Sequence, residues 1–195
     1  MDYFLELFFE VVPFVVTAGA VYLVLRAVRL KRRGLSRDNW LRELVRLAFV
    51  CYLAGLLALV WAPNAMWGQM WQFFRYGWPM DWWKVMFKGT YSFDFGFLDV
   101  ASGAFVHSMR VGNVVMFVPL GLLLPLRWPE LTAPKALGVG ICIDLVIEVV
   151  QPMFGRSFDL EDLLCNTLGI LLGLVVYALL RLAAPRFVRV CQGGR

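Results

Sequence analysis

Long uninterrupted runs of apolar residues are the feature that most constrains how this chain folds. A helix needs roughly 17–25 such residues to cross a bilayer. A soluble domain of 195 residues would struggle to bury a composition that is 61% hydrophobic, since ordinary globular chains are nearer half apolar. The runs are continuous rather than short and alternating, so the sequence predicts an all-α integral membrane protein, not a barrel. The five predicted spans are Tyr3–Val28, Leu44–Trp61, Val111–Leu126, Ala136–Met153 and Leu163–Leu182.

Basic residues set the predicted orientation of these spans within a single membrane domain, residues 1–195. Eight Lys and Arg lie from Arg26 to Arg46, in and beside the connection between the first two spans, two lie between the third and fourth spans, and four lie from Arg181 to Arg195 at the end of the fifth and beyond it. Because cytoplasmic loops carry an excess of Lys and Arg, these segments are predicted to be cytoplasmic. An odd number of spans then places the N-terminus outside and the C-terminus in the cytoplasm. The net charge of +5 thus reflects topology, and no nucleic-acid partner is expected.

The connection between the second and third spans, residues 62–110, is rich in Trp, Phe and Tyr. Aromatic rings collect at the boundary between lipid and water because they are amphipathic. We expect this outer segment to lie on the membrane surface as an interfacial helix or folded loop, with a short hairpin in "GTYSFDFGF". A lid over a molecule bound in the outer leaflet is the alternative.

Polar side chains interrupt the fourth predicted span. Asp144, Glu148 and Gln151 are spaced i, i+4, i+7 and therefore share one face of a helix. An ionised side chain at the centre of a span costs at least about 2.5–3.5 kcal/mol. We therefore expect this face to point into the bundle, with its acids paired to Arg110 or Arg156.

The predicted topology brings other polar residues to the same depth. The third and fifth spans begin on the outer side and the fourth ends there, so residues distant in sequence converge. Intramembrane ionisable groups usually mark a functional site, and the sequence predicts an outward-facing polar pocket. A polar staple that only holds three helices together is the alternative. The expected ligand-binding residues are Arg110, Asn113, Glu148, Gln151, Arg156, Asp159, Asp162 and Asn166.

Three glycines and a proline are predicted to be structural. Gly169 and Gly173 form a GxxxG pair, which permits close contact between membrane helices. Gly121 lies within the third span. Pro119 in the same span lacks a backbone N–H and is expected to kink the helix, freeing a carbonyl near Val115.

Two spaced patterns run through these residues. The first, N-x-x-x-F-x-P-L-G, begins at Asn113, and the second, E-x-x-Q-x(4)-R-x-x-D-x-x-D-x-x-x-N-x-x-G-x-x-x-G, begins at Glu148. Together they resemble the VanZ-like family of small bacterial membrane proteins over about Leu44–Leu182. The resemblance implies a multi-pass protein of the bacterial cytoplasmic membrane. It also implies a role in lowering susceptibility to teicoplanin-type lipoglycopeptides.

Three functions fit this pattern. The first is binding or modification of an amphiphile, such as a lipoglycopeptide or a lipid-linked wall precursor, in the outer leaflet. The second is an intramembrane hydrolase or transferase in which Glu148, Asp159 or Asp162 supplies acid–base groups or holds a divalent cation. The third is a non-catalytic structural or assembly factor. The sequence shows no zinc-like spacing. If the protein binds or modifies an amphiphile, neither a metal nor another cofactor is expected. The sequence assigns no oligomeric state.

Overall fold

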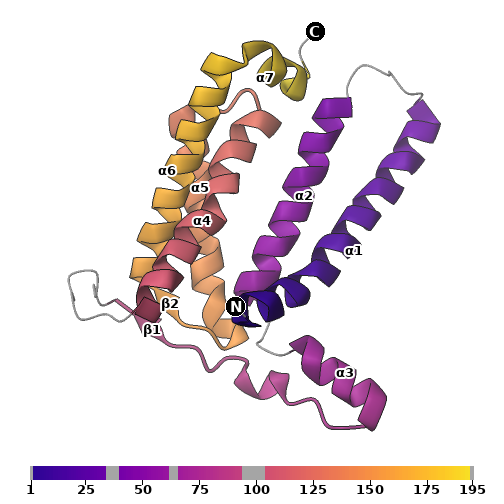
Figure 1. Ribbon diagram of the computed structural model, residues 1–195, viewed down its shortest axis with the longest axis vertical. Helices are drawn as coiled ribbons and strands as arrows, with labels where there is room; N and C mark the ends of the chain where they lie inside the picture. The colour runs from indigo at the N-terminus through magenta and orange to yellow at the C-terminus, as the bar shows by residue number, and fades with distance from the viewer. Residues whose placement is uncertain (1, 34–39, 62–65, 94–103, 194–195) are drawn as a thin grey trace.

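The computed structural model describes residues 2–33, 40–61, 66–93 and 104–193 (Figure 1). Five of its helices are long and apolar enough to cross a membrane, which confirms the predicted fold class. Each predicted span lies within one of them, except that the fourth runs on into a short 3₁₀ turn, η4 (Gln151–Phe154). The five long helices are α1 (Asp2–Arg33), α2 (Trp40–Trp61), α4 (Ala104–Arg127), α5 (Ala133–Val150) and α6 (Leu160–Ala183).

Helices α4, α5 and α6 lie close together, α2 completes a core group with them, and α1 lies outside this group against α2 (Figure 1). Leu56, Phe117, Leu120, Ile147 and Ile170 are almost completely buried within that group. Only 6% of the apolar window of α1 is buried, against 28–33% for the other four spans. The core therefore belongs to α2 and α4–α6, and α1 is peripheral.

The two ends of the bundle differ in chemistry. At one end, which we call the polar end, lie the N-terminus, helix α3 (Met66–Tyr76), η4 and two short strands, β1 (Tyr91–Ser92) and β2 (Phe158–Asp159) (Figure 1). At the other, the basic end, α1 finishes, α2 starts and helix α7 (Pro185–Gln192) packs. Neighbouring spans run in opposite directions, so the polar residues of three helices meet at one end.

Helices α4 and α6 approach closely enough for backbone to touch backbone. A Cβ placed on Gly169 would lie 2.2 Å from the carbonyl oxygen of Val114, and one on Gly121 would lie 2.1 Å from that of Ile170. Gly173 meets α4 in the same way. Because no larger residue fits at these distances, the three glycines set the spacing of the helix pair.

Helix α4 continues through both of its prolines, Pro119 and Pro125. Proline removes one backbone hydrogen bond, and a carbonyl of the preceding turn loses its donor. Next to the predicted position at Val115, the carbonyl of Met116 accepts a hydrogen bond of 3.0 Å from the Tyr52 hydroxyl. Helix α2 is thus fastened to α4 in the turn that Pro119 weakens.

The aromatic segment between the second and third spans contains α3 and a 3₁₀ turn, η2 (Trp82–Val85). On α3 the rings of Trp71, Phe74 and Tyr76 are 61–76% exposed, as an interfacial helix requires. The predicted hairpin is wrong for the part of "GTYSFDFGF" that the structure describes. Strand β1 instead pairs in parallel with the distant strand β2, because aromatic side chains hold the two together: Phe93 packs on Phe158 with ring centroids 5.5 Å apart.

Candidate functional site at the polar end

Four polar side chains form a buried inner layer between α5 and α6. Asp144, Glu148, Gln151 and Asn166 are only 0%, 1%, 6% and 2% exposed. The amide nitrogen of Asn166 donates to Asp144 at 2.8 Å and to Glu148 at 3.3 Å. The i, i+4, i+7 face of the fourth span therefore does point into the bundle, and it meets an amide there.

Glu148 accepts most of the hydrogen bonds within this layer. Its second oxygen lies 3.5 Å from the backbone nitrogen of Asp159. In the orientation that satisfies both ends of its amide, Gln151 donates to Glu148 at 3.3 Å and to the carbonyl of Ser157 at 3.0 Å. Glu148 thus accepts hydrogen bonds from three neutral donors, two of them side-chain amides.

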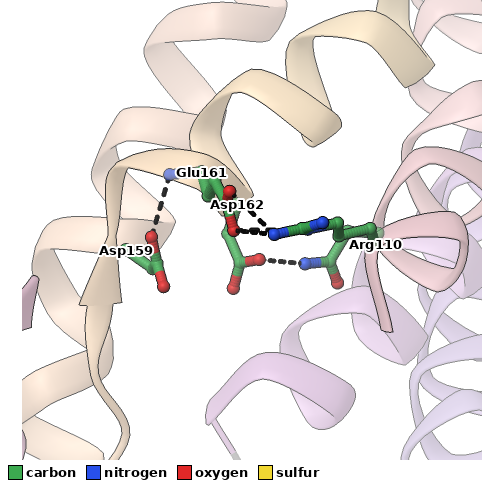
Figure 2. Close-up of polar contacts among 5 residues, drawn as sticks. Arg110, Asp159, Glu161 and Asp162 are labelled. Carbon is green, nitrogen blue, oxygen red and sulfur yellow. Dashed lines mark hydrogen bonds and ion pairs between the residues drawn. The ribbon is translucent and has the colours of Figure 1, made fainter. Parts of the chain in front are cut away.

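An outer layer of half-buried residues surrounds the start of α6 (Figure 2). Asp159 caps the helix by accepting a 2.9 Å hydrogen bond from the backbone nitrogen of Glu161, a common stabilising arrangement at a helix start. The amide of Asn113 on α4 donates to Asp162. Arg110 reaches across from α4 to Glu161 and places its guanidinium 3.0–3.3 Å from both carboxylate oxygens.

The predicted arginine partners of the two buried acids are wrong. Arg110 binds Glu161, a residue outside the predicted site. The carboxyl groups of Asp144 and Glu148 accept hydrogen bonds from the neutral amide of Asn166 instead. Taking an arginine to that depth would add the cost of dehydrating a second charge, and amides avoid it. Glu161 lies in the first turn of α6, at the same predicted depth as Arg110. That shared depth is the sequence signal from which the pair could have been predicted.

Arg156, the other predicted partner of the buried acids, contacts α2 instead. Its guanidinium donates a 2.9 Å hydrogen bond to the carbonyl of Leu59 near the end of α2. Trp61, two residues on, stacks on Phe154 with ring centroids 5.7 Å apart, and its indole donates to the carbonyl of Ile147. These contacts tie α2 to the connection between α5 and α6, so all of the core helices frame the polar end.

A strap of residues 87–92 covers this connection from the outside. Its backbone nitrogens at Phe87 and Gly89 donate to carbonyls of the η4 turn at 3.0 and 3.2 Å. The hydroxyls of Thr90 and Ser157 lie 2.7 Å apart. A Cβ on Gly89 would lie 1.8 Å from the carbonyl oxygen of Arg156, so only glycine permits the strap to lie this close.

The site offers more hydrogen-bond acceptors than donors. Among the described residues, no Lys or Arg lies within ion-pair distance of Asp144, Glu148, Asp159 or Asp162. One oxygen of Asp144 and the amide oxygen of Asn166 are buried without a partner in that part of the chain. Buried polar atoms are normally paired, so the site has unused capacity for a molecule that donates hydrogen bonds.

The metal-binding alternative gains no support from this geometry. In the described ranges, no three side chains of His, Cys, Asp or Glu lie close enough together to hold a metal ion. Asp159 is engaged in capping α6, and Asp162 faces Asn113. The predicted site residues do converge at one end of the bundle, but as a packed hydrogen-bonded layer with a half-exposed rim.

Comparison with known proteins gives two matches. Residues 49–181 match the family described as VanZ/LLP1, and every predicted site residue lies within that range. Protein VanZ of Enterococcus faecium is 33% identical over 70 residues, which cover 35% of this chain and 44% of that protein. The match thus spans less than half of that relative. No solved structure matches.

Proposed function

The chain belongs to the VanZ/LLP1 family of membrane proteins, and on that premise we propose that it binds an amphiphilic envelope molecule at its polar end. The arginines of the basic end, Arg26, Arg29, Arg42 and Arg46, belong in the cytoplasm by the positive-inside rule. The polar end then faces outward from the cytoplasmic membrane. We take lipid-linked wall precursors and lipoglycopeptides as the candidate amphiphiles at this face.

The surroundings of Glu148 are the observation that carries this proposal. Its carboxyl group is 1% exposed and is surrounded by neutral donors, with no described cation at ion-pair distance. A chain gains nothing in stability from burying a carboxyl this way, because a packed apolar residue costs less. We infer that the acids accept hydrogen bonds from hydroxyl, amide or ammonium groups of the ligand, as sugar and peptide head groups present.

The half-buried outer layer around the start of α6 favours such a head group over a bare phosphate, because its arginines are already engaged. Arg110 is already bound to Glu161 through both carboxylate oxygens, and Arg156 is bound to the carbonyl of Leu59. Asp159 and Asp162 each have one oxygen engaged and stand half-exposed. The ligand is therefore expected to meet these acids first, where the outer layer is open to it.

An apolar groove between α2 and α5 suits the ligand's hydrocarbon chain. Its volume is about 760 Å³, and its walls include Leu53, Leu57, Trp61, Val146 and Ile147. Trp61 stands at its polar-end limit, next to the η4 turn. The groove runs from there along the helices, so one amphiphile would place its head at the acids and its chain in the groove.

Binding to the purified protein tests this proposal. Native mass spectrometry of the detergent-solubilised chain measures binding of a lipid-linked wall precursor and of teicoplanin. Asp162→Asn keeps the shape and removes the charge, and we expect it to weaken binding about tenfold, as the loss of one charge-assisted hydrogen bond does. Glu130→Gln, on the exposed turn after α4, is the matched control and should bind as the unmodified protein does.

The other two functions give different outcomes in the same experiment. A hydrolase or transferase would return the precursor with a changed mass, and Glu148→Gln would abolish that change. A structural factor would bind neither ligand, and Asp162→Asn would lower only its thermal stability. Bound ligand of unchanged mass that is lost in Asp162→Asn but kept in Glu130→Gln distinguishes binding from both.

A further inference from the structure

A second polar site lies at the basic end, far from the acids. It is a cavity of about 820 Å³ between α1, α2 and α4, within the usual range for ligand sites. Four of the side chains that line it are arginines, contributed by three helices: Arg26, Arg29, Arg46 and Arg127. The proposed function uses none of them.

A single glutamate offsets part of this charge. Glu43 on α2 pairs with Arg26 at 2.7 Å and with Arg46, and it accepts a 3.0 Å hydrogen bond from the Tyr22 hydroxyl. These contacts hold two of the arginines in place beside the cavity. Among the carboxylates of the described chain, only that of Glu43 lies within ion-pair distance of these four arginines, so the cavity is strongly positive.

The other two arginines keep their charge for a ligand. Among the residues that the structure describes, neither Arg29 nor Arg127 lies within ion-pair distance of a carboxylate. Arg127 lies over the ring of Trp128, 4.8 Å from its centroid. Stacking of this kind fixes the plane of the guanidinium and leaves its N–H edge free to bind. Arg46 also has a buried Nε with no hydrogen-bond partner in the described chain.

One wall of the cavity is apolar and lies beside lipid. Phe49 and Trp128 pack edge to face with centroids 5.1 Å apart. Leu25 on α1, also in the lining, is 53% exposed on the peripheral helix. Since α1 packs mainly against α2, the cavity borders the leaflet as well as the aqueous side. It therefore combines cations at head-group depth with an apolar surface beside them.

We propose that this cavity binds the phosphate head group of an anionic phospholipid from the surrounding leaflet. Arginine binds phosphate through two parallel hydrogen bonds, and four guanidinium groups exceed what one glutamate neutralises. The cytoplasmic leaflet is rich in anionic lipid, which basic sites between membrane helices attract. The apolar wall of Phe49 and Trp128 would contact the first part of the acyl chains. The lipid would occupy the cavity between α1 and the core helices α2 and α4.

Native mass spectrometry of the purified full chain in detergent tests the proposal, with phosphatidylglycerol, phosphatidylcholine and inorganic phosphate as separate probes. We expect phosphatidylglycerol to bind about tenfold more tightly than phosphatidylcholine, as charge-assisted hydrogen bonds predict. The double variant Arg29→Gln/Arg127→Gln should lose this preference. The matched control Arg181→Gln/Arg186→Gln removes the same charge from exposed positions at the same end and should keep it.

Each other outcome overturns the proposal. Equal binding of the two lipids, or an unchanged preference in the double variant, excludes the arginine site. Full competition by inorganic phosphate would assign the cavity to a soluble anion instead of a lipid. If the double variant elutes as an aggregate, the single variant Arg29→Gln replaces it, because Arg29 is exposed and unpaired with acid in the described chain. That variant should weaken the preference by about threefold.

Discussion

The side-chain amide of Asn166 lies 2.8 Å from a carboxylate oxygen of Asp144, and this contact joins α6 to α5 inside the apolar bundle. The same amide reaches Glu148 at 3.3 Å. Both acids are nearly inaccessible to solvent. One neutral residue therefore donates to two acids that no described arginine approaches within ion-pair distance.

Replacing that amide should destabilise the fold more than any rim substitution. Asn166→Leu leaves two buried carboxyl groups without their shared donor, and we expect a loss of about 2–4 kcal/mol in the free energy of unfolding. Thermal unfolding of the detergent-solubilised protein measures it. Leu168→Ala, at a 48% exposed position on the same helix, is the control and should cost far less. Equal losses in the two variants would contradict the role of Asn166.

The contact between α4 and α6 gives a second prediction. Gly169→Ala puts a methyl group 2.2 Å from the carbonyl oxygen of Val114, so the helices must separate at a cost of about 1–3 kcal/mol. Gly138→Ala on α5 is the matched control, because nothing lies within 4 Å of its Cβ position. It should leave stability unchanged or raise it slightly, since alanine favours a helix. The same thermal unfolding experiment compares the two.

The strap makes a third prediction, which concerns the parallel pairing of β1 with β2. The hydroxyls of Thr90 and Ser157 lie 2.7 Å apart, so Thr90→Cys with Ser157→Cys should form a disulfide on mild oxidation. The mass of the joined proteolytic peptides detects the bond. The pair Arg186→Cys with Ser157→Cys serves as the control, since these two exposed residues lie at opposite ends of the bundle. Cross-linking of both pairs alike would show that the strap does not hold this register.

The fourth prediction concerns which end of the helix bundle faces the cytoplasm. A membrane-impermeant maleimide applied to intact cells should label Ser157→Cys, which is exposed at the polar end, and not Arg186→Cys, which is exposed at the basic end. Native Cys191 gives little background there, because it is 1% exposed and burial raises the pKa of its thiol, so less thiolate is present at neutral pH. Labelling of Arg186→Cys alone would place the acids in the cytoplasm and remove the basis for an outer-leaflet ligand.

The sequence by itself determined the five membrane helices and the end of the bundle at which their polar residues meet. Both follow from properties of the linear chain: the length of each apolar run, the helical period that puts Asp144 and Glu148 on one face, and the alternating direction of successive spans. Those quantities do not depend on which helix neighbours which.

Only the tertiary structure decided which side chains, helices and strands contact each other. The rotation of each helix about its axis gave Arg110 to Glu161 and left Asn166 to the buried acids. The close approach at Gly169 set how near α4 stands to α6. Strand β1 found β2 across 66 intervening positions, between Tyr91 and Phe158. Spacing within one segment carries no information about these choices, because they depend on the packing of segments against each other in three dimensions.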